Sequence, residues 1–459
     1  MKNAIAEKFK KKFEFIQVDE AQDISPVQYE IAKKLAEYTG NLCLVADDDQ
    51  CIYAWRGADP TQILNIKDDF PTATIIYMER NFRSAPYIVE KCNVFIKGNQ
   101  KRYKKEMYTE NKFEGTINAV AHATVMEQSK NITKQILKEK EFNKTAILYR
   151  NNSSALPIIL QCLTETIPFN INVKENSIFK QFILDDIMSF YMFANDLTNK
   201  EEFLNIAYKM DMIYVKKAIL KSVVEQAHGN LLVTLGETDI KSTIVTNLKM
   251  RFMHLAQSKN ATEFLKVLFN ELNYKKFILK KADENSIDIL YALAENENNI
   301  ENVIEKIANL LDKLSNKEYD KNGMTLMTLH SSKGLEWQNV YLVDFSSTII
   351  PNEKADVEEE RRLAYVGYSR SIKRLSINYY LKGDKKQEPS IFIEELLPET
   401  NTDPIELMAI NNKISHSAFG IGTIIEKKGN IVLIKFVKYG VKKLNSDILI
   451  NKNLIREID

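Results

Sequence analysis

Residues Val18–Asp23 read VDEAQD, and they follow an apolar stretch, Phe13–Val18, whose pattern predicts a buried strand. Asp19 and Glu20 therefore lie where that strand ends. In α/β folds that hydrolyse nucleotides, carboxylates at this position hold Mg²⁺ and orient the attacking water. An acidic pair after an apolar run is also common at a solvated strand end that leads into a turn. Only the rest of the chain can decide between these two interpretations.

A nucleotide site of this kind also needs a glycine-rich phosphate loop of the form G-x-x-x-x-G-K-[ST]. No Gly-Lys pair occurs anywhere in the 459 residues, and only about a dozen residues precede the first predicted strand. The sequence thus predicts one half of a nucleotide site. We expect the chain to be truncated at its N-terminus relative to a complete enzyme.

The length and composition indicate a globular protein of more than one domain. With 459 residues, 44% of them hydrophobic, the chain can bury several cores. Its formal net charge is +1, so any site for a polyanion must be local. Basic residues cluster twice, and we expect each cluster to be a solvated face. The clusters are Lys8, Lys10, Lys11 and Lys12, and then Lys97, Lys101, Arg102, Lys104 and Lys105.

Cysteines, histidines and apolar runs argue against several classes of protein. The four cysteines form no C-x-x-C pair and no disulfide framework, so we expect reduced thiols and a cytoplasmic location. Five scattered histidines argue against a zinc site. The N-terminus lacks the apolar core of a secretory signal, and no apolar run approaches ~18 residues. A membrane span is therefore not expected.

Residues 1–82 alternate between strand and helix patterns. A helix is predicted over Val27–Tyr38, with Ser25 as its N-cap and Gly40 just past its end. The predicted strands are Phe13–Val18, Leu42–Val45 and Thr74–Met78. Strands that alternate with helices are typical of a parallel sheet.

A second α/β region is divided by a long helical segment. The pattern predicts one α/β domain from residues 83–167 and 322–398, with a helical insertion at residues 168–321, where amphipathic spacing replaces strand signals. Residues 399–412 are typical of a linker. Residues 413–459 predict a small barrel of about five short strands.

The segment Leu44–Ala58 reads LVADDDQCIYAWRGA and carries a second set of candidate residues. A strand delivers three aspartates and Gln50 to its end, and an amide can report a γ-phosphate because it both donates and accepts hydrogen bonds. Tyr53 and Trp55, beside Arg56, suit a platform on which single-stranded bases stack. The alternative is that both aromatic residues belong to the core.

Three further segments place charged residues near the ends of predicted strands or helices. They are Met78–Ser84, MERNFRS, with Arg83; Met327–Trp337, MTLHSSKGLEW, with His330, Lys333 and Glu336; and Glu358–Arg374, EEERRLAYVGYSRSIKR, with Arg370. Arginines of one domain that reach a phosphate bound by another would neutralise charge that develops during transfer. The alternative is a set of surface charges and, for the EEERR run, a helix with surface ion pairs.

In order and wording, these segments closely resemble motifs II to VI of the UvrD/Rep/PcrA family of superfamily 1 DNA helicases. The matching stretches are VDEAQD, DDDQCIYAWRGA, ERNFRS, MTLHSSKGLEW and EERRLAYVGYSR. AILYR at Ala146–Arg150 is similar to an intermediate motif of the family. HSAFGIGT at His416–Thr423 is similar to the small Tudor-like barrel of PcrA-type members. The resemblance covers essentially the whole chain and is least specific across the helical segment.

The resemblance implies an α/β fold with two RecA-like parallel-sheet domains, the first incomplete, a helical insertion and a C-terminal Tudor-like β-barrel. It implies ATP and Mg²⁺ as cofactors and single-stranded and duplex DNA as substrates. Translocation would run 3′ to 5′, and DNA repair is one process in which such motors act.

The resemblance also implies a role for each matching residue. Asp19 would hold Mg²⁺ and Glu20 would be the catalytic base. On the nucleotide, Gln50, Arg83 and Arg370 would contact the γ-phosphate, and Glu336 would bind the ribose. On DNA, Tyr53 and Trp55 would stack bases beside Arg56. His330 and Lys333 would lie in the loop that couples the two sites.

The chain departs from the family in what lies upstream of motif II. The Walker A loop, the adenine-reading glutamine motif and the first DNA motif are absent from this sequence. The leading hypothesis is an N-terminally truncated helicase that is inactive alone, whose Walker A portion is lost or supplied by a separate chain. The alternative is a non-catalytic module that binds DNA and protein, docking for example on RNA polymerase through residues 413–459.

Overall fold

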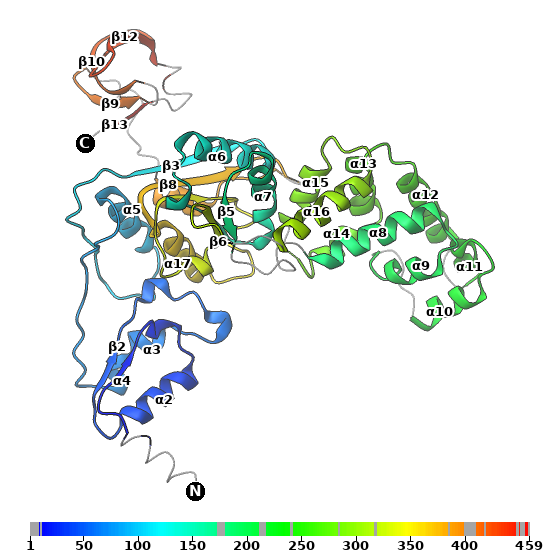
Figure 1. Cartoon of the computed structure of the whole chain (residues 1–459), viewed down its shortest axis with the longest axis horizontal. Coiled ribbons are helices and arrows are strands. Elements are labelled where there is room, and N and C mark those ends of the chain that lie inside the picture. The colour runs from blue at the N-terminus through cyan, green and yellow to red at the C-terminus, as the bar shows by residue number, and fades with distance from the viewer. Residues whose placement is uncertain are drawn as a thin grey trace. The chain divides into compact units, whose positions relative to one another are not determined.

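A computed structural model describes residue 9 and residues 12–171, 180–210, 217–238, 242–282, 285–315, 319–383, 386–398, 410–416, 419–446, 449 and 455–457 (Figure 1). The chain divides into two compact units, residues 1–397 and residues 398–459. None of the described helices is both long and apolar enough to cross a membrane.

The larger unit is built on a six-stranded sheet in which every neighbouring pair is parallel, in the order β3-β8-β7-β4-β6-β5. The strands are β3 (Thr116–His122), β4 (Thr145–Tyr149), β5 (Phe169–Ile171), β6 (Met324–Thr328), β7 (Trp337–Leu342) and β8 (Ser371–Tyr380). The first three precede the helical segment and the last three follow it. The expected return of the chain to one sheet is therefore present.

Alternate residues of the central strand β4 enter two different cores. Ala146 and Leu148 pack with α5 (Pro86–Ile96), α17 (Val357–Tyr368) and α18 (Ile391–Leu396). Ile147 and Tyr149 pack on the other face, with α6 (Val125–Glu139) and α7 (Ala155–Thr164). Side chains alternate along a strand, so both faces of β4 are covered and all five of its residues are buried.

All the regular secondary structure in the described residues between β5 and β6 is helical. Its helices are α8 (Gln181–Asn195), α9 (Lys200–Ile206), α10 (Lys217–Gln226), α11 (Leu231–Gly236), α12 (Ser242–Ala256), α13 (Ala261–Lys266), α14 (Tyr274–Ile278), α15 (Asn285–Ala294) and α16 (Ile300–Ser315), with a π-helical turn at Val267–Glu271. Their apolar faces join one core that continues under β4 and β6. The amphipathic spacing predicted for this segment is present, for example, in α16.

The N-terminal region holds a two-stranded parallel sheet, β1 (Ile16–Val18) with β2 (Leu42–Leu44). The helix between them, α2 (Pro26–Ala36), begins at a Ser25 N-cap that forms a capping box with Gln28, as the sequence predicted for Ser25. Short helical turns follow each strand. They are η1 (Ala21–Asp23), η2 (Asp48–Gln50), η3 (Ala54–Arg56), α3 (Thr61–Leu64) and α4 (Ile66–Asp69).

The predicted third strand of this region, Thr74–Met78, is wrong. In the described structure the segment forms no strand ladder, and its nearest pairing is an isolated bridge between Arg80 and Tyr108. A strand exists only where a neighbour satisfies its backbone groups, and β1 and β2 pair only with each other. Ile76 and Met78 are consequently exposed.

The smaller unit contains a five-stranded antiparallel sheet in the order β12-β11-β10-β9-β13. Its strands are β9 (Lys413–His416), β10 (Gly420–Lys428), β11 (Ile431–Phe436), β12 (Gly440–Asn445) and β13 (Ile455–Glu457). Its core includes the buried side chains of Ile424, Ile434 and Phe436. The predicted set of about five short strands is confirmed, while the predicted linker 399–412 lies outside the described residues except for 410–412.

Candidate nucleotide and DNA site

The acidic pair lies at the carboxyl end of β1, where the chain turns sharply. Glu20 has a left-handed backbone, with φ 50° and ψ 40°, and donates its backbone N–H to Asp19 Oδ1 at 2.9 Å. This conformation costs a residue with a Cβ roughly 1–2 kcal/mol. Such strain persists only where the surroundings hold it, and it is common at functional sites. Buried Gln22 helps to hold it by donating from Nε2 to Glu20 Oε2 at 2.6 Å.

The second strand brings its own polar residues to the same edge of the sheet. β1 and β2 are parallel, so their carboxyl ends meet. Asp47 donates its backbone N–H to Gln22 Oε1 at 3.0 Å. Gln50 donates from Nε2 to Asp47 Oδ2 at 2.6 Å. Glu20, Gln22, Asp47 and Gln50 therefore form one connected hydrogen-bond chain.

Arg370, which follows α17 (Val357–Tyr368), contacts this chain of hydrogen bonds from the side of the six-stranded sheet. Its guanidinium is 1% exposed and donates from Nη2 to Gln50 Oε1 at 3.2 Å. Burial and the nearby positive charge of Arg83 lower the Arg370 pKa to about 10, so the group is charged at neutral pH. A buried cation next to another cation favours an anion at this place.

Arg83 lies beside Arg370 and is fixed by two contacts. Its Nε donates to Glu336 Oε2 at 2.5 Å, and its Nη1 donates to the backbone oxygen of Ser369 at 3.1 Å. Ser369 also accepts, through Oγ, a hydrogen bond from Arg370 Nη2 at 2.8 Å. The two arginines of motifs IV and VI thus share one anchoring residue.

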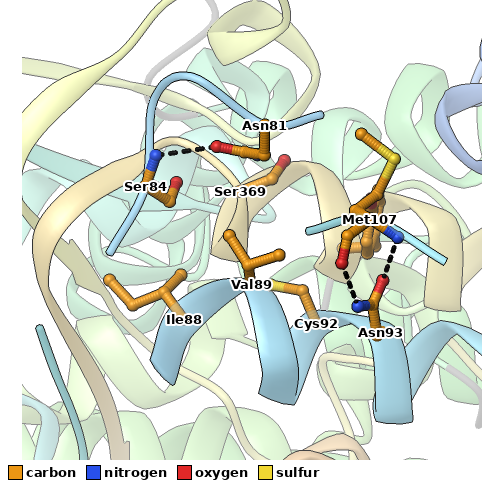
Figure 2. Close-up of a pocket in the computed structure, with 9 residues that line it drawn as sticks. Asn81, Ser84, Ile88, Val89, Cys92, Asn93, Met107 and Ser369 are labelled. Carbon is orange, nitrogen blue, oxygen red and sulfur yellow. Dashed lines mark hydrogen bonds between the residues drawn. The ribbon is translucent and has the colours of Figure 1, made fainter. Parts of the chain in front are cut away.

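A small pocket lies behind the loop that carries Arg83. Figure 2 shows its lining residues, Asn81, Ser84, Ile88, Val89, Cys92, Asn93, Met107, Tyr365 and Ser369. Asn81 Oδ1 accepts from the backbone N–H groups of both Arg83 and Ser84, at 2.9 and 2.8 Å. Burial raises the pKa of the Cys92 thiol to about 12, so this cysteine is not a nucleophile. The pocket supports the arginine loop rather than offering reactive groups.

Lys333 connects the acidic edge to the loop after β6. Its ammonium group is close to Glu20 Oε2 at 3.1 Å and donates to Asp23 Oδ2 at 2.5 Å and to the Gln50 carbonyl at 2.9 Å. The side chain is 8% exposed. Burial raises the pKa of Asp23, against the opposing effect of Lys333. Lys333 therefore joins residues more than 280 positions apart along the chain.

The residues expected to stack bases form a compact platform beside Lys333. Tyr53 donates from its hydroxyl to the His330 carbonyl at 3.3 Å, and Lys333 Nζ lies 5.9 Å from the Tyr53 ring centre. The Arg56 guanidinium lies 4.4 Å from the Trp55 ring centre and 4.9 Å from that of Tyr53. Trp55 is 67% exposed, whereas Tyr53 is half-buried against the core. The core interpretation thus applies in part to Tyr53 and not to Trp55.

His330 lies under this platform next to a residue that the sequence did not assign to the site. Burial, with the positive charges of Arg150 and Arg56, lowers the His330 pKa to about 4, so the ring is neutral at pH 7. Arg150 is held in turn by Glu360 of α17, with Nη2 to Oε1 at 2.9 Å. Arg150 is the last residue of the AILYR stretch, and its place in that stretch could have indicated that it belongs to the site.

The second basic cluster was expected to be a solvated face, and for two of its members this is wrong. Arg102 donates from Nε and Nη2 to the two oxygens of Asp49, both at 2.8 Å. Lys105 reaches Asp47 and Asp48 at 2.7 and 2.5 Å. Three adjacent aspartates cannot be buried without counter-charges, and the DDD run was therefore the available signal.

The described residues contain no group of three or more His, Cys, Asp or Glu side chains placed to hold a metal ion. Mg²⁺ bound with a nucleotide takes one or two carboxylates and completes its shell with phosphate oxygens and water. Asp19 is exposed at the end of β1. One exposed carboxylate fits that mode of binding.

Comparison with known proteins matches the chain to one family over most of its length. The model of the UvrD/REP helicase N-terminal domain matches residues 1–71, and that of the UvrD-like helicase C-terminal domain matches residues 76–258 and 284–382. A solved C-terminal domain of a possible DNA helicase from Lactobacillus plantarum aligns over 69% of this chain and 95% of that chain, with TM-score 0.29 and 9% identity, which is too low to define the fold.

The curated relatives that match this chain are named ATP-dependent DNA helicases. The ATP-dependent DNA helicase Rep of Buchnera aphidicola subsp. Acyrthosiphon pisum is 30% identical over 437 residues, which cover 85% of this chain and 67% of that protein. The ATP-dependent DNA helicases PcrA of Leuconostoc citreum and Staphylococcus aureus are 26% and 27% identical and cover 95% and 96% of this chain. The chain spans about two thirds of the length of these relatives.

Proposed function

This chain belongs to the UvrD/Rep/PcrA-like family of superfamily 1 helicases, and on that premise we propose that it forms the catalytic and DNA-gripping part of an ATP-dependent 3′–5′ DNA helicase. The single observation that carries the proposal is the contact between Arg370 and Gln50. It joins a buried cation of one parallel sheet to the amide at the end of another, 320 positions away, with Glu20 on the same hydrogen-bond chain.

On the nucleotide side, each residue has a role that its surroundings support. Asp19 would hold Mg²⁺, which when bound supplies charge neutralisation on the phosphates. Glu20 would accept the proton of the attacking water, and its carboxylate accepts a hydrogen bond from buried Gln22. Gln50, Arg83 and Arg370 would bind the γ-phosphate. Arg370 is buried and the Arg83 side chain is 27% exposed, and the attraction between a cation and a phosphate is stronger where water is excluded.

Glu336 has a double role in this proposal. It pairs with Arg83 Nε through Oε2. A ribose hydroxyl at Glu336 would compete for that carboxylate and so release Arg83 toward the phosphates. Nucleotide binding would then move an arginine as well as fill a site, which is the differential contact that a conformational switch requires.

On the DNA side, Trp55 and Tyr53 would stack bases and Arg56 would hold the platform. Lys333 is the link between the two sites, because it contacts Glu20 and the Gln50 backbone and lies beside the Tyr53 ring. Movement of the His330–Lys333 loop toward DNA would therefore disturb the acidic edge. Alternating closure and opening of this contact would drive translocation.

The phosphate-binding loop of the family has no counterpart in these 459 residues. We propose that the chain alone binds ATP weakly and does not unwind DNA, and that a Walker A-bearing segment or separate chain completes the site. The exposed edge favours such a complement. β1 and β2 form only a two-stranded parallel sheet, with Phe15 and Val45 exposed at its ends.

The experiment measures ATP hydrolysis and single-stranded DNA binding by the purified chain alone. We expect no DNA-stimulated turnover. We also expect binding of a labelled oligothymidylate that Trp55→Ala weakens by about 1–3 kcal/mol, since stacking on one aromatic residue contributes that amount. Robust turnover that Glu20→Gln abolishes would contradict the proposed inactivity. Binding that Trp55→Ala leaves intact would contradict the platform.

A second candidate function is a non-catalytic module that binds DNA and docks on a protein such as RNA polymerase. Its support is the smaller unit, which we propose to be a Tudor-like barrel. Val437, Tyr439 and Val441 expose 82%, 54% and 52% of their surface near one hairpin. Pull-down of RNA polymerase by the full chain, lost on Tyr439→Ser, would support docking. No capture, together with ATPase activity rescued by a Walker A chain, would favour the helicase.

A further inference from the structure

Residues 99–107, here called the strap, are hydrogen-bonded at both ends to helices of the six-stranded sheet region. At the first end, Asn99 Nδ2 donates to the backbone oxygen of Glu358 at 2.9 Å, and Arg362 Nη2 donates to that of Lys101 at 2.8 Å. At the other end, Met107 exchanges two hydrogen bonds with the side chain of Asn93 on α5, at 2.6 and 3.0 Å (Figure 2). Both ends are thus fixed to helices that cover the six-stranded sheet.

The middle of the strap grips the aspartates that follow β2. Arg102 binds both oxygens of Asp49, and the backbone N–H of Tyr103 donates to Asp48 Oδ2 at 2.7 Å. Lys105 Nζ lies within 2.7 Å of Asp47 Oδ1, 2.5 Å of Asp48 Oδ1 and 3.4 Å of Asp49 Oδ2. The strap, which is anchored on helices that cover the six-stranded sheet, therefore holds the residues at the end of β2.

Most of this ion cluster is buried, so most of its charges are shielded from water. The side chains of Asp48 and Asp49 are 3% and 1% exposed and that of Lys105 is 14% exposed, whereas that of Asp47 is 31% exposed. Three carboxylates face two cations, which leaves one excess negative charge. Although burial opposes the charge on Lys105, the three aspartates raise its pKa and keep it protonated. Loss of Lys105 would leave two uncompensated charges and free Asp47 to turn.

Asp47 carries the effect of the strap to the nucleotide site. Its Oδ1 accepts from Lys105, while its Oδ2 accepts from Gln50 Nε2 at 2.6 Å. Because the amide nitrogen of Gln50 is held in this way, the amide oxygen faces Arg370 Nη2. A free amide would flip between its two orientations, and only this one presents an acceptor to the arginine.

We propose that Lys105 is a positioning residue of the nucleotide site, which fixes the Gln50 amide through Asp47 and ties its orientation to the placement of the strap. The strap would then carry domain closure to the γ-phosphate contact through the Gln50 amide. This inference rests on the proposed function for its catalytic consequence, but not for its geometry.

The first test needs no nucleotide. Hydrogen–deuterium exchange of the full chain is followed in peptides that cover residues 45–51, for the wild type, Lys105→Met, Lys105→Arg and the exposed control Lys104→Met. We expect Lys105→Met to speed exchange in these peptides by at least about tenfold, because η2 loses the cation that reaches all three aspartates, although the Arg102–Asp49 pair remains. Lys105→Arg and Lys104→Met should leave it within about twofold. Unchanged exchange in Lys105→Met would overturn the inference whether or not the chain is a helicase.

The second test uses the chain complemented with a Walker A-bearing segment, and it measures KM and kcat for ATP. We expect Lys105→Met to lower kcat by at least about tenfold with KM changed by less than about threefold, because a misplaced Gln50 weakens the transition state more than the ground state. Lys105→Arg should restore kcat. A purely structural role would instead lower the folded fraction and leave the kcat of folded molecules unchanged.

A charge-balanced variant separates positioning from folding. Lys105→Met combined with Asp48→Asn leaves two carboxylates and Arg102, which is the same excess of one negative charge as in the wild type. We expect this double variant to recover the wild-type Tm while its kcat stays low. Recovery of kcat together with Tm would contradict a role through Asp47. If the complemented wild type shows no ATPase, the proposed function fails while the exchange experiment still decides the inference.

Discussion

His330 illustrates how burial sets the chemistry of a single residue at this site. It lies between the aromatic platform and Arg150, and its pKa is lowered to about 4 by burial and by two neighbouring cations. A neutral imidazole can accept a hydrogen bond or pack on an aromatic ring without adding to the positive charge around it. The coupling loop thus begins with an uncharged residue, while Lys333, three positions later, supplies the charge.

The same shift predicts a pH dependence of stability. Between pH 6.5 and about 4, the unfolded chain binds more protons at His330 than the folded chain. The free energy of unfolding should therefore fall as pH decreases through this window, and the contribution is fully present above it. From pH 7 to pH 5 the expected loss is about 1–2 kcal/mol.

Urea denaturation at the two pH values, for the wild type and His330→Gln, measures this contribution. His330→Gln should lose less stability on acidification than the wild type by that amount. The matched control is His228→Gln, at an exposed position, which should behave as the wild type does. Equal acid sensitivity of His330→Gln and wild type would mean that His330 is not held neutral.

At the scale of elements, the loop before α5 decides where Arg83 lies. Asn81 accepts two backbone N–H groups of this loop through one side-chain oxygen, and the Ser84 hydroxyl donates to the backbone oxygen of Ser371 at 2.7 Å. These bonds hold the backbone at the start of α5 without any contribution from the Arg83 side chain. The loop is therefore preorganised rather than shaped by a ligand.

Asn81→Ala should lower the free energy of unfolding by about 1–2 kcal/mol, because it leaves the buried N–H of Ser84 without its acceptor. Asn81→Asp keeps an oxygen at the same place and should lose less than half of that. Urea unfolding followed by circular dichroism checks both values. A neutral Asn81→Ala would show that this side chain does not hold the loop.

Elements that were predicted well from the sequence carry their signal within the element itself. α2 has its cap in Ser25, and the amphipathic spacing predicted for residues 168–321 is present in helices such as α16. Thr74–Met78 failed because an apolar extended run cannot reveal whether a neighbour exists. Arg102 and Lys105 were missed because their partners, Asp47–Asp49, lie more than 50 positions away.

The candidate site shows the same limit at the level of single contacts. The resemblance of the motifs to the helicase family was enough to name Glu20, Gln50, Arg83 and Arg370 as one set. They did not indicate that Gln22 and Asp47 connect the set, that Glu336 pairs with Arg83, or that Arg150 shifts the pKa of His330. These are three-dimensional contacts between side chains with no characteristic spacing.

On the scale of the whole molecule, we propose that the chain supplies two of the three walls of a nucleotide site. The acidic edge of β1 and β2 forms one wall, and the arginines beside α5 and α17 form the other. Amides and a lysine that would cradle the β- and γ-phosphates are not among its motifs. The central claim is therefore that Glu20 and Arg83 act on one triphosphate once a phosphate loop is present.

The most direct measurement is ATP hydrolysis stimulated by single-stranded DNA, in the chain combined with a Walker A-bearing polypeptide from a Rep relative, for wild type, Glu20→Gln and Arg83→Gln. We expect stimulated turnover for the wild type and a loss of about 100-fold or more in each variant, with unchanged Tm. Stimulated turnover that survives Arg83→Gln would place the arginines outside the reaction and overturn the proposed site.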